Sequence, residues 1–249
     1  MNSNYEKGLE IFKSGLKELN INLDDNQIQQ FIKYYEYLVE KNKVMNLTAI
    51  TEFEEVIVKH FLDSLSIINA IDLKCYSDEV CIIDIGTGAG FPGIPLKIAY
   101  PHINFVLLDS LNKRINFLNE VIELLDLQGI SAVHGRSEEL AHSPLYREKF
   151  DFCVSRAVAN MSVLAEFCVP FVKVDGKFIS YKAGDSDEEI KEGEYAINLF
   201  GGKINKEILF TIPNSDISRK LVVIDKFKST GKKYPRKAGT PAKNPIKKD

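Results

Sequence analysis

Three closely spaced glycines follow an acidic residue in this chain, and together they could hold a nucleotide-like ligand. The stretch reads Val80-Cys81-Ile82-Ile83-Asp84-Ile85-Gly86-Thr87-Gly88-Ala89-Gly90-Phe91-Pro92-Gly93. Glycine has no Cβ, so the backbone of such a turn can approach a ligand closely. The apolar run before the turn predicts a buried parallel strand. The amphipathic stretch after it predicts a helix whose first turn holds Pro92.

The turn fits two cofactor patterns. Residues 88–93 match the G-x-G-x-x-G fingerprint of dinucleotide sites, and residues 84–90 match the acidic-x-G-x-G-x-G form of S-adenosylmethionine sites. Asp109, at the end of the next predicted strand, suits both, because a carboxylate there can accept hydrogen bonds from ribose hydroxyls. The methyl donor is favoured by Asp84, by the helical segment that precedes the turn, and by a predicted antiparallel hairpin late in the chain. Asp84 could hold the turn or meet the ammonium group of the donor.

The segment after the fourth predicted strand indicates the kind of acceptor atom. It reads Val154-Ser155-Arg156-Ala157-Val158, without the D/N-P-P-Y/F motif of exocyclic-amine methylation, and the chain has no Pro-Cys pair for attack on pyrimidine C5. Guanine N7 has an unshared electron pair and no proton to lose, so transfer to it needs positioning more than a general base. Arg156 could contact the donor, guanine O6 or an RNA phosphate, or it could form a structural ion pair.

Hydrophobic periodicity predicts an α/β protein with a helical extension. Helices are expected over 5–19, after Asp24 or Asp25, and after a capping box formed by Thr51 and Glu54. Strands alternating with helices are then expected at 80–85, 104–109, 130–134, 150–155 and 177–182, followed by antiparallel strands at 203–212 and 220–227. The pattern divides the chain into a helical extension (1–74), a doubly wound domain (75–228) and a basic tail (229–249). A polar cluster is possible at His60, Asp63 and Ser64.

Charge is distributed unevenly along the 249 residues. The net charge is −3, yet the segment from Lys226 to the end holds nine basic residues and one acid. An acidic body with a basic tail indicates a local contact with a polyanion, although a solubilising tail has the same composition. Tyr234, Arg236 and Lys237 could combine stacking with phosphate contact. Lys113 and Arg114 open a predicted helix at the same edge of the sheet as Arg156, where they suit contact with RNA phosphate.

Other features limit the class of protein. The four cysteines form no C-x-x-C pair and the four histidines are scattered, so no metal site is predicted. No apolar run is long enough for a membrane span, and the first residues do not resemble a signal peptide. A reducing, cytoplasmic location is expected.

Four motifs together resemble the RsmG family, the bacterial 16S rRNA guanine-N7 methyltransferases also called glucose-inhibited division protein B. These are Asp84 to Gly93, Gly135-Arg136-Ser137-Glu138, Ser155-Arg156-Ala157-Val158 and Tyr234-Pro235-Arg236-Lys237-Ala238-Gly239-Thr240-Pro241. The resemblance begins at Asn46-Leu47-Thr48 and His60-x-x-Asp63-Ser64. Ser137 stands where many members have Ala, Met45 stands where members often have an aromatic residue, and Lys182-Ala183-Gly184 replaces a more usual Lys-Gly.

The resemblance implies a cytoplasmic, monomeric enzyme with the class I methyltransferase fold, a mostly parallel seven-stranded sheet with an antiparallel edge. It implies S-adenosylmethionine as cofactor and, as partner, 16S rRNA or the 30S particle, with one guanine in the loop of helix 18 near the decoding site as target. The family's donor contacts fall on Gly86, Phe91, Ser137, Glu138 and Arg156. Thr87, Gly88, Gly90 and Asp109 complete the expected donor site. Two alternatives remain open: an NAD-type oxidoreductase, and a non-catalytic RNA-binding assembly factor.

Overall fold

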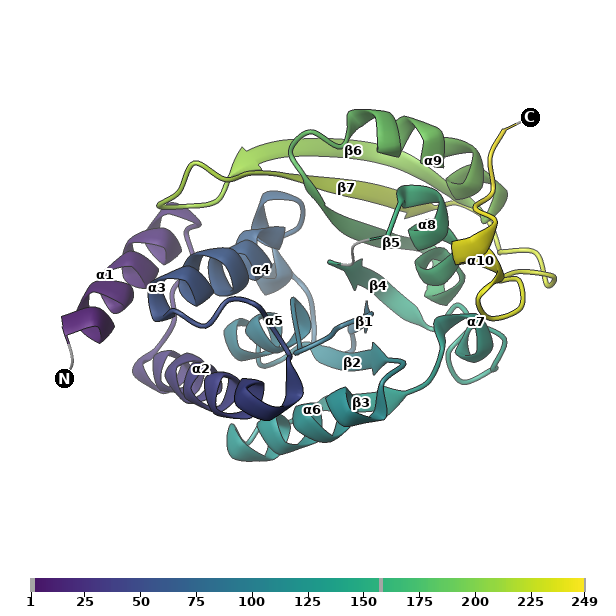
Figure 1. The fold of residues 1–249 in the computed structure, drawn as a ribbon. Coiled ribbons are helices and arrows are strands. Elements are labelled where there is room, and N and C mark those ends of the chain that lie inside the picture. The colour runs from purple at the N-terminus through teal and green to yellow at the C-terminus, as the bar shows by residue number, and fades with distance from the viewer. Residues whose placement is uncertain (1–2, 157–158, 249) are drawn as a thin grey trace.

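A single seven-stranded sheet forms the centre of the molecule. The computed structural model describes residues 3–156 and 159–248, and its strands lie in the order β3-β2-β1-β4-β5-β7-β6 (Figure 1). The strands are β1 Cys81–Ile85, β2 Asn104–Asp109, β3 Ile130–His134, β4 Phe150–Ser155, β5 Val172–Ala183, β6 Gly202–Thr211 and β7 Ser218–Lys226. β1 to β5 pair in parallel, whereas β7 runs antiparallel to β5 and β6. The predicted parallel sheet with an antiparallel edge is confirmed.

One strand differs from its predicted bounds by more than two residues. β5 begins at Val172, five residues before the expected start at Lys177. The Asp175-Gly176 pair was expected to form a turn before the strand, but it lies inside it. Pairing with β4 shifts register there, and Asp175 takes a left-handed conformation with φ of 70°. A bulge thus absorbs the turn-forming residues while the strand continues.

Helices cover both faces of the sheet. α5 Gly93–Ala99 and α6 Asn112–Leu124 pack with the amino-terminal helices on one face. α7 Ser137–Leu140, α8 Met161–Cys168 and α9 Asp187–Leu199 pack on the other, close to α10 Thr240–Lys243. Adjacent residues of a strand point into different hydrophobic cores, one on each face of the sheet. Ile82 belongs to the buried cluster on the side of α5 and α6, and Ile83 belongs to the one on the side of α8 and α9. This period of two is what a sheet covered on both faces requires. Pro92 is the N-cap of α5, so the helix begins one residue later than predicted.

The amino-terminal region consists of helices that follow one another closely. They are α1 Ser3–Glu18, α2 Asp25–Met45, α3 Phe53–Val56, the π-helical η1 Ile57–Leu62, α4 Asp63–Leu65 and the 3-10 turn η2 Ser66–Asn69. Asp24 caps α2 through a capping box with Gln27, as one of the two predicted caps. The capping box predicted for Thr51 and Glu54 is wrong. α3 starts after Glu52 without a side-chain cap, and the Thr51 carbonyl accepts a hydrogen bond from the Tyr35 hydroxyl of α2.

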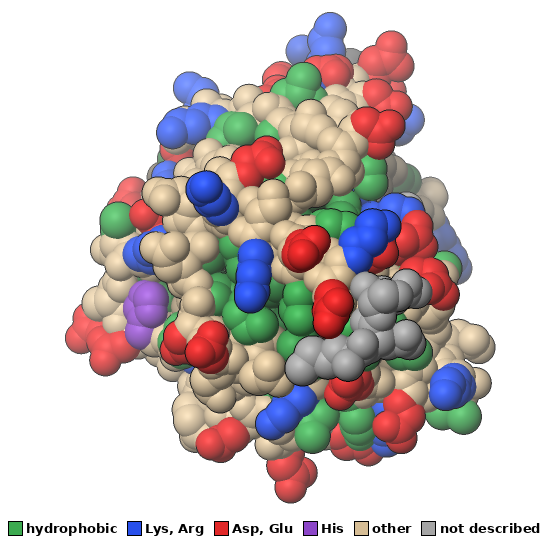
Figure 2. All heavy atoms as spheres, turned by 90° about the vertical axis from the view of Figure 1, so that its left-hand side faces the viewer, with side chains coloured by type: hydrophobic (Ala, Val, Ile, Leu, Met, Phe, Trp, Pro, Cys, Tyr) green, Lys and Arg blue, Asp and Glu red, His purple; other side chains and the backbone are tan. Residues whose placement is uncertain are grey.

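The amino-terminal helices share one hydrophobic core with the sheet. Phe31 and Phe61 belong to the same buried cluster as Phe105 and Phe152 of the strands. The division of the chain at residues 74 and 228 stays a prediction, and across the first of these boundaries the buried cluster is continuous. On the side of α1, acidic and basic side chains are mixed over the surface (Figure 2). In the described part of the chain, no helix combines the length and apolarity needed to cross a membrane.

Tyr34 joins α2 directly to the glycine turn. Its side chain is fully buried, and its hydroxyl donates a hydrogen bond to the carbonyl of Ala89. The amino-terminal helices therefore support the turn as well as the sheet.

We expect Tyr34→Phe to lower the free energy of unfolding by about 1–3 kcal/mol, because the buried Ala89 carbonyl loses its donor. Urea unfolding measures the change. Tyr5→Phe is a matched control, since its hydroxyl donates to Glu36 at 3.3 Å on the surface, and its effect should stay within about 0.5 kcal/mol. Equal effects of the two substitutions would contradict the role given to Tyr34.

Candidate active site

A cavity of about 1120 Å³ opens where the parallel strands end. Its wall includes Ile85 at the end of β1, Asp109 at the end of β2, and Tyr181 near the end of β5. Ligands of doubly wound sheets bind at these carboxyl ends. The volume exceeds the 300–1,000 Å³ or so that is typical of a site for one small molecule. The cavity can therefore hold a cofactor together with part of a second reactant.

The glycine turn lines this cavity with some of its residues but not all. Gly86 and Gly88 have φ of 72° and 64°, a region open to glycine. Both line the cavity, and a Cβ on Gly88 would meet nothing closer than the Gly86 carbonyl oxygen at 4.0 Å. A Cβ on Gly90 would lie 2.6 Å from Ile94 and 2.9 Å from the Tyr34 hydroxyl. Gly90 therefore shapes the turn and is not among the residues that line the cavity, and its contact with the donor stays a prediction.

Asp84 holds the turn from inside the protein. Its Oδ2 accepts hydrogen bonds from the Thr87 hydroxyl at 2.7 Å and the Gly93 amide at 2.9 Å. Its Oδ1 has no hydrogen-bond partner among residues 3–156 and 159–248. Burial raises the pKa of Asp84 to about 7. Of its two predicted roles the structure shows the first, holding the turn, since Asp84 does not line the cavity.

Asp109 connects the second strand to the turn. Its Oδ2 accepts from the Gly88 amide at 3.0 Å and from Nη1 of Arg114 at 3.1 Å, and its Oδ1 accepts from the Leu111 amide at 2.9 Å. A carboxylate offers about four acceptor positions, so one position remains for a ligand hydroxyl. The predicted ribose contact is compatible with this arrangement.

The two basic residues after β2 have partners within the protein. Arg114 lines the cavity and pairs with Asp109, while Lys113 donates to the carbonyl of Met45 at the end of α2. Both were predicted to contact RNA phosphate. Each joins α6 to a neighbouring element, and the RNA contacts stay predictions.

The carboxyl-terminal tail closes the cavity beside β3. Ser137 and Glu138 line the cavity, as do Gly239 and Ala242 of the tail. Oε1 of Glu138 accepts a hydrogen bond from the Gly239 amide at 2.8 Å. The predicted donor contact at Glu138 therefore lies where the tail is attached.

Buried side chains anchor the tail. Glu166 of α8 is 1% exposed and accepts from the backbone amide of Arg236 at 2.7 Å and from its Nη2 at 2.7 Å. The Tyr234 ring packs edge-on against Phe200 with 5.1 Å between centroids. Tyr234 and Arg236, predicted to bind RNA, are thus tied into the fold, whereas Lys237 is exposed and stays a prediction.

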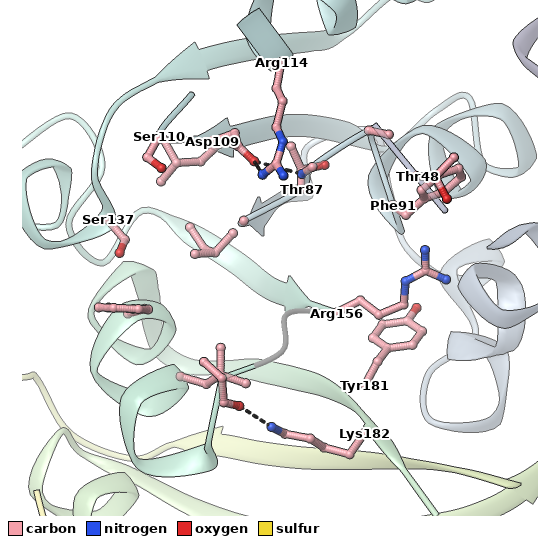
Figure 3. A pocket seen from close by; sticks show the side chains of 18 of the residues that line it. Thr48, Thr87, Phe91, Asp109, Ser110, Arg114, Ser137, Arg156, Tyr181 and Lys182 are labelled. Carbon is pink, nitrogen blue, oxygen red and sulfur yellow. Dashed lines mark hydrogen bonds and ion pairs between the residues drawn. The ribbon is translucent and has the colours of Figure 1, made fainter. Parts of the chain in front are cut away.

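Arg156 closes the opposite end of the cavity. Its Nη1 donates to Oδ2 of Asp63 at 2.7 Å and to the Lys59 carbonyl at 3.2 Å, and its guanidinium carbon lies 5.0 Å from the Phe91 ring centroid. The side chain extends from the end of β4 and lies near Tyr181 and Phe91 (Figure 3). The structural ion pair, the alternative role for Arg156, is the one that the structure shows. Residues 157 and 158 of the same motif lie outside the described residues.

His60 forms part of this wall through the π-helical turn of η1. Its ring stacks on Phe91 with centroids 4.4 Å apart, and its Nε2 lies 2.9 Å from the Thr48 hydroxyl oxygen. Burial, and then the charge of Arg156, lowers the pKa of His60 to about 3, so the imidazole is neutral near pH 7. The predicted polar cluster exists in part, since the Ser64 hydroxyl donates to the His60 carbonyl and Asp63 pairs with Arg156.

Three polar residues of the cavity wall illustrate what the sequence does not predict. Tyr181 donates to the carbonyl of Ser64 at 2.7 Å, Lys182 pairs with Glu189 at 2.5 Å, and Arg219 of β7 pairs with Asp63 at 3.2 Å. Lys182 belongs to a motif that was noted only as a departure. Arg219 carries no local signal, because only strand pairing brings it beside Ala183.

The family model described as rRNA small subunit methyltransferase G matches residues 27–214. The chain belongs to this family. It is 55% identical to ribosomal RNA small subunit methyltransferase G of Lachnoclostridium phytofermentans, over 94% of this chain and 96% of that protein. It is 53% identical to the protein of the same name from Alkaliphilus metalliredigens, over 95% and 98%. TrmN from Thermus thermophilus shares the fold, with a TM-score of 0.51 and 11% identity over 69% of this chain and 53% of that chain.

The chain is therefore a methyltransferase of the class I fold that depends on S-adenosylmethionine, and the dinucleotide alternative is excluded. The turn fits this cofactor, because Gly88 leaves open space and Asp109 keeps an acceptor position. Within residues 3–156 and 159–248, no three His, Cys, Asp or Glu side chains are grouped to hold a metal ion.

The raised pKa of Asp84 predicts a dependence of stability on pH. The ordinary pKa of 3.8 rises to about 7 on folding, so the folded protein binds the proton more tightly. The stabilising contribution is fully present below about pH 4 and is lost as the pH rises through about 7. We expect wild type to lose up to about 4 kcal/mol relative to Asp84→Asn between pH 4 and 8, measured by urea unfolding. Asp216→Asn, on an exposed loop, controls for the loss of a carboxylate. Parallel pH profiles for wild type and Asp84→Asn would refute the assignment.

The anchoring of the tail predicts different effects for two neighbouring basic residues. Arg236→Ala leaves the buried Glu166 unpaired, so it should cost about 3 kcal/mol of stability. It should also weaken S-adenosylmethionine binding, because the tail contacts Glu138. Lys237→Ala should change stability by less than about 0.5 kcal/mol and leave donor affinity unchanged. Thermal unfolding and isothermal titration test both, and equal donor affinities in wild type and Arg236→Ala would count against the coupling.

Proposed function

We propose that this enzyme transfers the methyl group of S-adenosylmethionine to N7 of one guanosine in 16S rRNA, in the loop of helix 18 near the decoding site. The names of the relatives support ribosomal RNA of the small subunit as substrate. The guanine and its N7 rest on the motif resemblance and on the chemistry of the cavity. We expect a monomer that acts in the cytoplasm, on 16S rRNA or the 30S particle.

The observation that carries the choice of N7 is that His60 and Lys182, two polar side chains of the cavity wall, already have hydrogen-bond partners within the protein. Nε2 of His60 lies 2.9 Å from the Thr48 hydroxyl oxygen, and its Nδ1 lies 3.1 Å from the Lys59 carbonyl oxygen. Lys182 donates to Glu189 and to the Ala159 carbonyl. A histidine with a pKa of about 3 is a weak base. This arrangement favours an acceptor that loses no proton, which is the property of guanine N7.

The donor supplies an electrophilic methyl carbon bound to a sulfonium sulfur. The backbone of the turn would contact the donor at Gly86, Thr87 and Gly88. Asp109 would accept a hydrogen bond from its ribose, and Ser137 and Glu138 would flank its base. Phe91 and His60 form an apolar and uncharged wall that limits the access of water. The contribution of the protein is then to orient two reactants along one line.

The cavity extends from the expected donor site to a rim that carries cations. Arg136 is exposed and lines the cavity, and Lys237 is exposed on the tail that closes it. Exposed cations at the rim suit a phosphate backbone, since phosphate contacts position the nucleic acid. We assign these two residues to RNA contact.

The test uses 16S rRNA and 30S particles from cells that lack this gene. With labelled S-adenosylmethionine, we expect one 7-methylguanosine within the helix 18 loop. An RNA carrying 7-deazaguanosine at that position is the matched control, because a carbon replaces N7 while the base keeps its shape. It should bind and accept no methyl group. Methylation of the 7-deaza RNA, methylation of another nucleotide, or donor binding without transfer would overturn the proposal. The last result would indicate a non-catalytic assembly factor.

A further inference from the structure

We infer that Arg219 of β7 binds a phosphodiester of the RNA backbone beside the target guanosine. The inference rests on the proposed function, because it assigns a subsite for the same substrate. It concerns the part of the cavity formed by Asp63, Arg156 and Arg219, which come from α4, the end of β4 and β7.

Asp63 forms ion pairs with two cations. Its Oδ2 accepts from Nη1 of Arg156 at 2.7 Å, and its Oδ1 accepts from Nε of Arg219 at 3.2 Å. The carboxylate is 2% exposed. One anion between two guanidinium groups leaves the cluster with a net positive charge, and this charge lies at the wall of the cavity. An anion is the complementary ligand.

The two arginines differ in what they leave available. Arg156 uses both of its terminal nitrogens, one toward Asp63 and the Lys59 carbonyl and the other 3.3 Å from Nδ1 of His60. Arg219 is held by Nε alone, and within residues 3–156 and 159–248 neither of its terminal nitrogens has a hydrogen-bond partner. Its side chain is 29% exposed. A guanidinium fixed by Nε with both Nη groups free presents a planar pair of donors, the geometry that matches phosphate oxygens.

Neighbouring cations at this edge of the sheet are already paired. Lys182 is 6% exposed and bonds Glu189, and Lys220 is 5% exposed and bonds Asp187 at 2.6 Å. Their ammonium groups are therefore neutralised and largely buried. Arg219 instead keeps free donors toward the cavity.

The position of β7 favours RNA over the donor as the source of the anion. The order β1-β4-β5-β7 places β7 three strands from the strand that carries the glycine turn. At a strand spacing of about 4.8 Å, this separates the backbones by about 14 Å. Arg219 pairs in the sheet with Ala183, and both residues line the cavity. The acceptor must enter from the side away from the donor turn, and its backbone then passes Arg219.

The test compares Arg219→Ala with Lys206→Ala. Lys206 lies on the adjacent strand β6, is exposed, and does not line the cavity, so its variant removes the same charge elsewhere. We expect Arg219→Ala to bind unmodified 16S rRNA about tenfold more weakly and to raise KM for RNA with kcat nearly unchanged. The slope of log affinity against log salt should become shallower by about 0.7–0.9, the loss of one phosphate contact. Lys206→Ala should match wild type in each measurement.

Two further measurements separate the competing explanations. Arg219→Lys keeps the charge and loses the planar pair of donors, so it should retain most of the salt slope while KM stays raised. S-adenosylmethionine affinity should equal that of wild type in each variant, and circular dichroism at the assay temperature verifies folding. If wild type methylates 16S rRNA and Arg219→Ala keeps its RNA affinity and salt slope, the inference is wrong. Weaker donor binding in Arg219→Ala would assign the anion to the donor carboxylate and would also overturn it. If wild type methylates no rRNA, the proposed function itself has failed.

Discussion

The buried carboxylate of Asp84 is the constraint on which the active site depends. It bonds both the Thr87 hydroxyl and the Gly93 amide, so the start of the turn and the start of α5 have a fixed separation. The Gly88 amide can then donate to Asp109 and join the ends of β1 and β2. A buried carboxylate is costly unless it is hydrogen-bonded. The same burial that raises its pKa makes these hydrogen bonds hard to replace by water.

The amino-terminal helices form a wall of the active site rather than an appendage to it. They supply Tyr34, which bonds the Ala89 carbonyl of the turn, and His60, which stacks on Phe91. They also supply Asp63, which pairs with Arg156 directly after β4 and with Arg219 of β7. The glycine turn and the part of the cavity near Arg156 are thus linked through a segment whose sequence has no cofactor motif. A change in the packing of these helices should therefore affect both regions.

Charge in the sequence does not reveal which cations are paired within the protein. The basic tail predicted RNA contact, yet Arg236 neutralises Glu166 and Lys226 is buried beside Glu148. Lys113 and Arg114 likewise bond within the protein. Arg236, Lys226 and Lys113 have partners that are remote in sequence, and Arg114 has one five residues away, so composition alone counts these cations as free. Arg219 is different, because it lies outside the basic tail and nothing in its own segment indicates that it lines the cavity.

The sequence by itself determined the strand and helix order and the glycine turn, and it favoured the methyl donor, because these depend on local periodicity and on residues adjacent in the chain. It predicted β2, β3 and β4 at their observed bounds. Only the tertiary structure decided which side chains face the cavity. It bonded Tyr34 to the Ala89 carbonyl of the turn, paired Arg156 with Asp63, and brought the tail to Glu138. These contacts join residues that are 55 to 101 positions apart. Packing of the whole chain fixes such distances, and no local pattern encodes them.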